Sequence, residues 1–298
     1  NGSRKAVIND QTIFAGHSLV GQVRVVESTE VEFDNTMLDG RQISAAQIRS
    51  FPLLEITDVK TLLMESLFHS KKPDSSENLL DEMSSISAVH IETCTRVKLN
   101  QTIFSNHISK SGGALSIIGT RLDSTTRKES LFSVIDCQVT KNTAQDNGGG
   151  VLLTDIPKAT ISGGIFSYNT SVEASGGAIF SSCKPRDCLM TFTKSQSDTH
   201  PQITFKHNQA HLNGGGFSWV DAAPVIDESV TFENEENVSK YGNNLAGTPF
   251  TIVPIESEEV TEVELPTVDS ISSVEPAVIL SDIRSGTSLE TPFLFALV

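Results

Sequence analysis

The sequence predicts an all-β chain that folds as a right-handed parallel β-helix, with the start of a second β domain at the C-terminus. A glycine-rich motif recurs along the middle of the chain, and short runs of alternating apolar residues separate its copies. The composition agrees: 38% apolar residues can form a core, whereas 6% aromatic residues leave much of the packing to small side chains. Right-handedness is expected because crossovers between parallel strands have that hand.

The recurring motif joins two short patterns. A large apolar residue is followed at the third position by Asn, and a glycine-rich step then leads into a new apolar run. The copies comprise Phe104 with Gly112 and Gly113; Val139 and Asn142 with Gly148 and Gly149; Phe166 and Asn169 with Gly176 and Gly177; Phe205 and Asn208 with Gly214 and Gly215; and a degenerate copy, Phe232 with Gly242. In the first copy Asn106 follows Phe104 by only two positions, and counting from Ile103 restores the spacing of three.

The spacing of the motif predicts a stack of similar units. Its apolar anchors lie 35, 27, 39 and 27 residues apart, which fits a unit of about 27 residues with two insertions. One such unit is too short to bury an apolar face, so the units must stack and share a core. Coils about 4.8 Å apart would place Phe over Phe inside and join the Asn amides in a ladder. The glycine pairs supply a positive φ and room for a sharp turn.

The predicted elements follow one another in three parts. Residues 1–85 are expected to hold early coils and a polar loop, and residues 86–249 the glycine-rich coils, whose alternating runs predict strands. Residues 250–298 change to an acidic stretch with alternating Val, expected to be a linker before the first strands of a further β domain. Loops leaving the helix are expected at residues 71–86, 121–129 and 184–200.

Charge and hydropathy exclude several partners. A formal net charge of −15 would repel nucleic acid and anionic membrane surfaces. No stretch approaches the roughly 20 apolar residues that span a bilayer, so direct membrane insertion is not expected. Surface carboxylates could gather Ca²⁺, but they are more often only solvated, and we expect no metal site and no cofactor.

Cysteines and glycosylation sequons indicate the compartment. Cys183 and Cys188 flank a Pro-containing turn and are the disulfide candidates, the alternative being free thiols; Cys94 and Cys137 are expected to stay reduced. Four Asn-x-Ser/Thr triplets permit N-glycosylation of a secreted chain, at Asn1, Asn100, Asn169 and Asn237. We therefore expect an extracellular protein, secreted or held at the cell surface.

The motif resembles a known repeat. The G-G-A-[L/I] steps, as at residues 112–115 and 176–179, together with F-x-x-N, as at 166–169 and 205–208, resemble the polymorphic outer-membrane-protein repeat of chlamydial surface adhesins. They are similar also to the large β-helix surface proteins of ciliates and other unicellular eukaryotes, in which residues 241–249 would match the usual last coil. The resemblance covers about residues 86–249 and implies a right-handed β-helix outside a cell. Val139 in place of Phe and a displaced fifth Asn depart from the pattern.

Catalysis is not expected. β-Helix polysaccharide lyases and glycoside hydrolases need carboxylates, with Arg or Lys, gathered on one outward face. The Asp residues that we considered fall in different phases of their repeats and are expected to be solvated; they are Asp136, Asp146, Asp155 and Asp221. His207 and His211 lack the Glu of a zincin, and Trp219 is expected to pack in the core rather than stack on a sugar.

Two function classes then lead. The first is an extracellular structural protein, a segment of a large repeat-built surface or filament glycoprotein whose partners are other copies or segments of itself and N-linked glycans. The alternative is an adhesin that binds ligands on a host or neighbouring cell through its loops. An enzyme on a β-helix is a second alternative.

Overall fold

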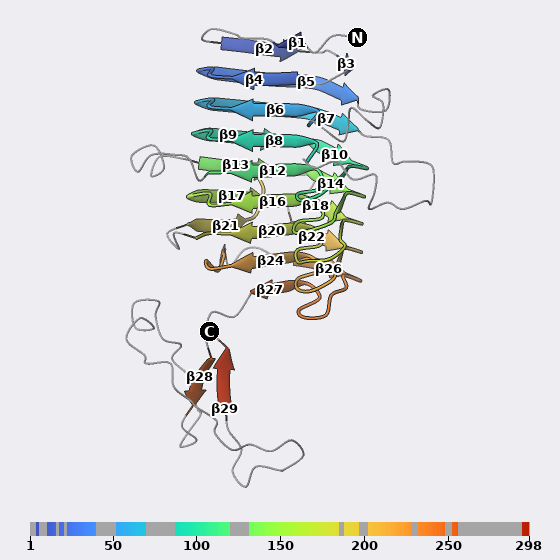
Figure 1. The fold of residues 1–298 in the computed structure, drawn as a ribbon, viewed down its shortest axis with the longest axis vertical. Helices are drawn as coiled ribbons and strands as arrows, with labels where there is room; N and C mark the ends of the chain where they lie inside the picture. Colours follow the sequence, from blue (N-terminus) through green and yellow to red (C-terminus); the bar gives the residue numbers. More distant parts are fainter. Residues whose placement is uncertain are drawn as a thin grey trace. The chain divides into compact units, whose positions relative to one another are not determined.

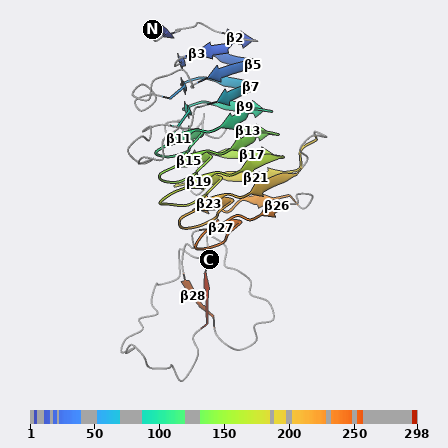
Figure 2. The ribbon, with the colours of Figure 1, turned by 90° about the vertical axis from the view of Figure 1, so that its right-hand side faces the viewer.

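A computed structural model describes twelve stretches of the chain, which are residues 4–5, 11–15, 18–20, 23–39, 52–69, 87–119, 131–184, 188–196, 202–227, 232–247, 252–255 and 294–297. They form a parallel β-solenoid (Figures 1 and 2), which confirms the predicted fold class. The right-handedness of the helix stays a prediction. The chain divides into two units, residues 1–248 and 249–298.

One flat face of the solenoid is a nine-stranded parallel sheet, called sheet A. Each coil contributes one strand to it, in chain order down the stack in Figure 1. The strands are β1 (Arg4–Lys5), β4 (Val23–Val26), β6 (Leu54–Thr57), β8 (Val89–Glu92), β12 (Leu115–Ile118), β16 (Val151–Thr154), β20 (Ile179–Ser182), β24 (Phe217–Val220) and β27 (Leu245–Gly247).

The opposite side is a branched sheet of 14 strands, called sheet B. Its early strands are β2 (Gln11–Ala15), β3 (Ser18–Val20), β5 (Glu30–Asp39) and β7 (Thr61–His69). The first part of β7 pairs with β9 and its last part with β10, so the sheet splits into two branches there. One branch holds β9 (Arg96–Asn100), β13 (Leu131–Ile135), β17 (Lys158–Ser162), β21 (Leu189–Thr193) and β25 (Val225–Ile226). The other holds β10 (Ile103–Ser105), β14 (Gln138–Thr140), β18 (Gly164–Ser167), β22 (Ile203–Lys206) and β26 (Phe232–Glu235).

Two smaller sheets complete the described strands. Sheet C closes the coils between sheets B and A with β11 (Ile108–Ser109), β15 (Thr143–Ala144), β19 (Thr170–Ser171) and β23 (Gln209–Ala210). In the second unit β28 (Ile252–Ile255) pairs antiparallel with β29 (Leu294–Leu297). Two strands lie where the start of another β domain was expected, but the existence of such a domain stays a prediction.

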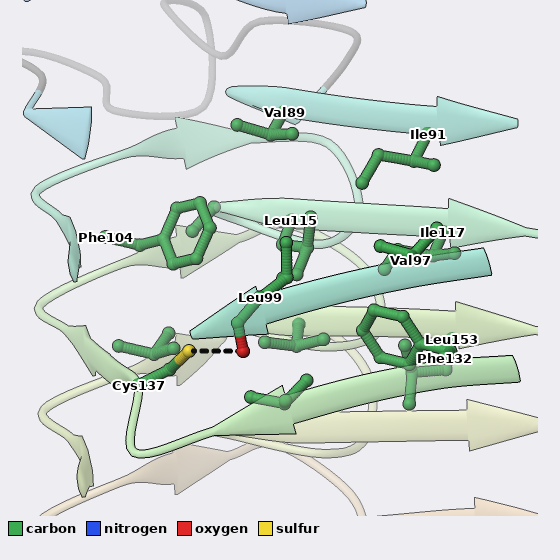
Figure 3. Close-up of a cluster of buried hydrophobic side chains, with 14 of the residues drawn as sticks. Val89, Ile91, Val97, Leu99, Phe104, Leu115, Ile117, Phe132, Cys137 and Leu153 are labelled. Atoms are coloured by element: carbon green, nitrogen blue, oxygen red, sulfur yellow. Dashed lines mark hydrogen bonds between the residues drawn. The ribbon is translucent and has the colours of Figure 1, made fainter. Parts of the chain in front are cut away.

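Alternation along each strand sends one apolar set into a shared core (Figure 3). Like residues stack as predicted, since the rings of Phe68 and Phe104 lie 5.0 Å apart and those of Phe166 and Phe205 lie 5.5 Å apart. All four rings are buried. Apolar area removed from water contributes roughly 25 cal/mol per Å², so these aromatic columns are a main source of stability in a chain poor in aromatics.

The register corrects three details of the sequence interpretation. Phe104 pairs in register with Val139, so the count from Ile103 is wrong and Asn106 lies outside the Asn column. Phe232 aligns with Ile203 rather than with Phe205, so the anchor of the fifth copy was misplaced. Residues 184–200 contain β21, so part of this expected loop is a solenoid strand. The loops expected at 71–86 and 121–129 lie outside the described residues.

The glycine pairs hold the turn that leads into sheet A. Gly148 has φ of 71°, a left-handed backbone that favours glycine. At Gly149 a Cβ atom would lie only 2.1 Å from the carbonyl oxygen of Gly177 in the next coil. The first glycine of each pair therefore sets the turn, and the second lets neighbouring coils approach.

Candidate functional site

A ladder of Asn side chains runs inside the solenoid, between sheets B and C. Asn142 Nδ2 donates to Asn169 Oδ1 at 2.9 Å, and Asn169 Nδ2 donates to Asn208 Oδ1 at 3.0 Å. Asn208 Nδ2 continues the chain to Asn237 Oδ1 at 2.9 Å. These four side chains are buried. The predicted Asn ladder is confirmed, and its fifth-copy member is Asn237, which the sequence had marked only as a sequon.

Each Asn side chain also binds the backbone of the preceding coil at two points. Asn169 Oδ1 accepts from the backbone N–H of Asn142 at 3.1 Å, and Asn169 Nδ2 donates to the carbonyl of Val139 at 2.8 Å. The amide thereby satisfies backbone groups that the turn removes from the sheets, and a buried polar group without a partner is costly. His107 occupies the ladder position of the first copy, where its backbone N–H donates to Asn142 Oδ1.

The ladder ends within the chain. Asn237 Nδ2 donates to Asn244 Oδ1 at 3.1 Å, and the backbone N–H of Ser239 donates to Asn243 Oδ1 at 3.0 Å. Asn243 and Asn244 stand where the preceding coils have glycine or alanine, and both are exposed. The coil of residues 232–247 therefore closes the stack of amides with its own side chains.

A second polar column, which the sequence analysis missed, follows the split of sheet B. Ser66 Oγ donates to the carbonyl of Phe33 at 3.3 Å, and Thr102 Oγ1 donates to that of Met64 at 3.0 Å. Cys137 Sγ donates to the carbonyl of Leu99 at 3.6 Å (Figure 3). The signal in the sequence was a small hydroxyl or thiol residue that recurs 36 and then 35 residues further along the chain.

The two free cysteines are structural. Cys137 is fully buried and Cys94 is half-buried. Burial raises the pKa of each thiol from 9.0 to about 12, because the thiolate would lose its hydration. A thiol with so high a pKa is a poor nucleophile at neutral pH. Both cysteines are free in the structure, and their staying reduced in the cell remains a prediction.

The candidate pair Cys183 and Cys188 forms a disulfide, with Cα atoms 6.0 Å apart. The bond closes a short loop between β20 and β21. Its place at a corner of the solenoid leaves the neighbouring strands in register with those of the preceding coil.

A hollow of about 170 Å³ opens on the outer face of sheet B, where β5, β7 and β9 lie side by side (Figure 2). We call it the outer hollow. Its lining includes three carboxylates, an ammonium, an amide and an outward apolar side chain, from Glu32, Asp34, Glu65, Lys98, Asn100 and Leu63, and Phe33 and Met64 complete it. Leu63 lies in register between Glu32 and Lys98, so an apolar patch separates opposite charges.

The outer hollow suits a polar ligand with many hydroxyl groups. Carboxylates accept hydrogen bonds, whereas Lys98 and Asn100 donate them. Asn100 Nδ2 already donates to Glu65 Oε2 at 3.2 Å. Acidic and basic residues thus lie together on one outward face of the solenoid. The sequence analysis had not selected any of these charged residues as a site residue. The sequence did contain a signal for this charged face, since charged residues alternate with apolar ones along residues 30–34 and 96–100.

The Asp residues that were considered do not come together. Asp136, Asp146 and Asp155 follow β13, β15 and β16, at three different corners of the coil. The expectation that all four differ in phase is wrong for Asp221, which follows β24 at the same corner as Asp155, two coils further along. The expectation that all are solvated is wrong for Asp136 and Asp155, which are 4% and 3% exposed. Asp155 Oδ1 accepts from the backbone N–H of Lys184 at 2.7 Å, which explains its burial.

The two histidines and the tryptophan that were weighed as site residues contact other side chains of the solenoid. His207 Nδ1 lies 3.0 Å from Glu236 Oε2, and its ring stacks on Tyr168 with centroids 4.7 Å apart. His211 Nε2 lies 2.9 Å from Lys240 Nζ, so the two histidines have separate partners. Trp219 packs against the core beside Phe217, with ring centroids 5.4 Å apart, as expected.

The Asn residues of the described sequons differ in how far their side chains are buried. Asn169 and Asn237 are 0% and 4% exposed and belong to the ladder, so the expectation that they carry glycans conflicts with the fold. Asn100 is half-exposed at the rim of the outer hollow. Asn1 lies outside the described residues.

Within the described ranges, no three His, Cys, Asp or Glu side chains are gathered so as to hold a metal ion. Those ranges also contain no helix long and apolar enough to cross a membrane. No protein-family model matches the chain, and neither a curated protein nor a solved structure matches it significantly. The solenoid is therefore established without a family assignment.

Proposed function

We propose that the chain is an extracellular structural module, a stiff non-catalytic rod within a repeat-built surface or filament protein. The observation that carries this proposal is the ladder from Asn142 through Asn169 and Asn208 to Asn237, which links successive coils inside the core. The Asn side chains that recur in the sequence thus hold one coil against the next. A surface rod needs such links, because coils joined only by backbone hydrogen bonds can open locally.

Two observations support the extracellular part of the proposal. The Cys183–Cys188 disulfide is typical of oxidising compartments, since cytosolic thiols are kept reduced. The net charge of −15 keeps a surface protein hydrated and soluble. We also propose, from the G-G-A and F-x-x-N motifs alone, kinship with polymorphic outer-membrane-protein-type repeats of chlamydial and protist surface proteins.

The proposal is tested in the organism that carries the gene. Immunogold labelling should place the protein outside the cell, and deletion of the gene should remove or weaken a surface layer or filament seen by electron microscopy. An intact surface with lost attachment to host or neighbouring cells would instead support the adhesin. Turnover of acidic or neutral polysaccharides by the purified protein, abolished by Lys98→Ala, would overturn the non-catalytic proposal.

A further inference from the structure

We propose that Asn100 carries an N-linked glycan whose first sugar ring lies in the outer hollow. This inference rests on the extracellular function proposed above. It selects one sequon among those described and gives the outer hollow a covalently attached occupant, an N-acetylhexosamine.

The sequons differ in how many side-chain N–H groups of the Asn are already used in hydrogen bonds. An Asn side chain has two N–H groups, and an N-glycosidic bond replaces one of them. Asn169 uses both, at 2.8 Å to the carbonyl of Val139 and 3.0 Å to Asn208 Oδ1. Asn237 likewise donates to the carbonyl of Phe205 at 2.8 Å and to Asn244 Oδ1 at 3.1 Å. A glycan on either residue would break the ladder and place a sugar in the core.

Asn100 meets the opposite conditions. It ends β9 with its side chain on the outer face, and Nδ2 makes one hydrogen bond to a described residue, 3.2 Å to Glu65 Oε2. The second N–H can be replaced by the bond to a sugar while the first still holds Glu65. Thr102, the third residue of the sequon, keeps its own bonds inside the solenoid and does not need to move.

The outer hollow fits the first sugar in size and chemistry. Its volume of about 170 Å³ is on the scale of one pyranose ring. Glu32 and Asp34 can accept from ring hydroxyls, Lys98 can donate to a hydroxyl or acetamido oxygen, and Leu63 offers an apolar patch to a sugar face. A ring held there would link the outer faces of β5, β7 and β9.

The attachment chemistry balances with a polyprenyl-diphosphate-linked oligosaccharide as donor. The Asn100 amide nitrogen bonds to the anomeric carbon, the bond from that carbon to the diphosphate oxygen breaks, and the diphosphate leaves with the electron pair. The amide proton passes to a base of the transferase. Transfer precedes folding, so a chain modified at Asn169 or Asn237 could not complete the ladder, and folded secreted molecules should lack glycans there.

The full chain is expressed in a eukaryotic secretory host, and occupancy of each sequon in the secreted, folded protein is read by glycopeptide mass spectrometry. Occupied Asn100 with bare Asn169 and Asn237 is expected. Thr102→Ser, which keeps the sequon and the buried hydroxyl, should retain the glycan, whereas Asn100→Gln should lose it. A secreted folded protein that is bare at Asn100, or occupied at a ladder Asn, overturns this inference.

Two further measurements separate the possible failures. Trimming the glycan to one N-acetylglucosamine should leave the melting temperature unchanged, and Lys98→Ala should lower it by about 2 °C only when that sugar is present. If Lys98→Ala lowers the melting temperature equally with and without the sugar, the sugar does not lie in the outer hollow. If the chain is retained in the cell, Ser171→Ala with Ser239→Ala removes the ladder sequons and keeps both amides. Restored secretion then supports the inference, and continued retention overturns both it and the extracellular function.

Discussion

Removing one amide from the middle of the ladder should cost more stability than a surface change in the adjacent coil. In Asn169→Ala the backbone N–H of Asn142, one of its side-chain N–H groups and the carbonyl of Val139 lose their partners. All three are in the buried ladder region, and each unpaired buried group costs about 1–3 kcal/mol. Partial relaxation reduces the sum, so we expect a loss of about 4 kcal/mol in the free energy of unfolding.

Equilibrium urea unfolding, followed by circular dichroism, measures this loss. The matched control is Gln145→Ala, which removes a half-buried surface amide paired with Glu173 at 3.3 Å and should change the free energy by less than about 0.5 kcal/mol. Asn169→Asp keeps the volume and an acceptor but lacks the donors, so it should be at least as destabilising as alanine. If Asn169→Ala unfolds within 0.5 kcal/mol of the unaltered chain, roughly the control's range, the ladder does not hold the coils together.

Three further predictions concern the turns and the cysteines. Gly149→Ala places a Cβ 2.1 Å from a carbonyl oxygen of the next coil and should cost more than about 3 kcal/mol, whereas Asn243→Ala, at the equivalent position of the closing coil, should cost about 1 kcal/mol in thermal unfolding. Cys94 and Cys137 should resist a thiol reagent at pH 8 until the chain unfolds. Because their pKa is raised from 9.0 to about 12 in the folded state, the free energy of unfolding should fall as pH rises from 9 to 12; a flat profile would contradict the burial of both thiols. Reduction of the disulfide should lower stability by about 2 kcal/mol, and an unchanged urea midpoint would show that the short loop contributes nothing.

The stacking could be predicted from the sequence because each coil of a solenoid uses the same residue types at the same positions. Phe166 and Asn169 recur at the same spacing as Phe205 and Asn208, so one physical argument served several coils. The disulfide could also be anticipated, since Cys183 and Cys188 are only five positions apart in the sequence. Errors arose where the repeat is imperfect: Phe232 aligns with Ile203, and His107 replaces an Asn of the ladder.

The outer hollow was harder to foresee, because its residues come from coils that lack the glycine motif. Glu32, Glu65 and Lys98 come together only once β5, β7 and β9 are in register, and the sequence places them 33 residues apart. Burial of two sequons was equally hidden, since Asn169-Thr-Ser satisfies both the glycosylation pattern and the ladder. A local pattern cannot decide between roles that differ only in which way the side chain points.

Amide hydrogen exchange of the native full chain tests the central claim most directly, because it reports how stiffly successive coils are held together. Backbone N–H groups of Asn142, Asn169 and Asn208 each donate to an Asn Oδ1 of the next coil, at 3.0–3.1 Å. We expect peptides containing them to exchange as slowly as the core strands of sheet A, and to lose that protection in Asn169→Ala. Rapid exchange at these positions in the unaltered chain would contradict a solenoid held together by its internal ladder.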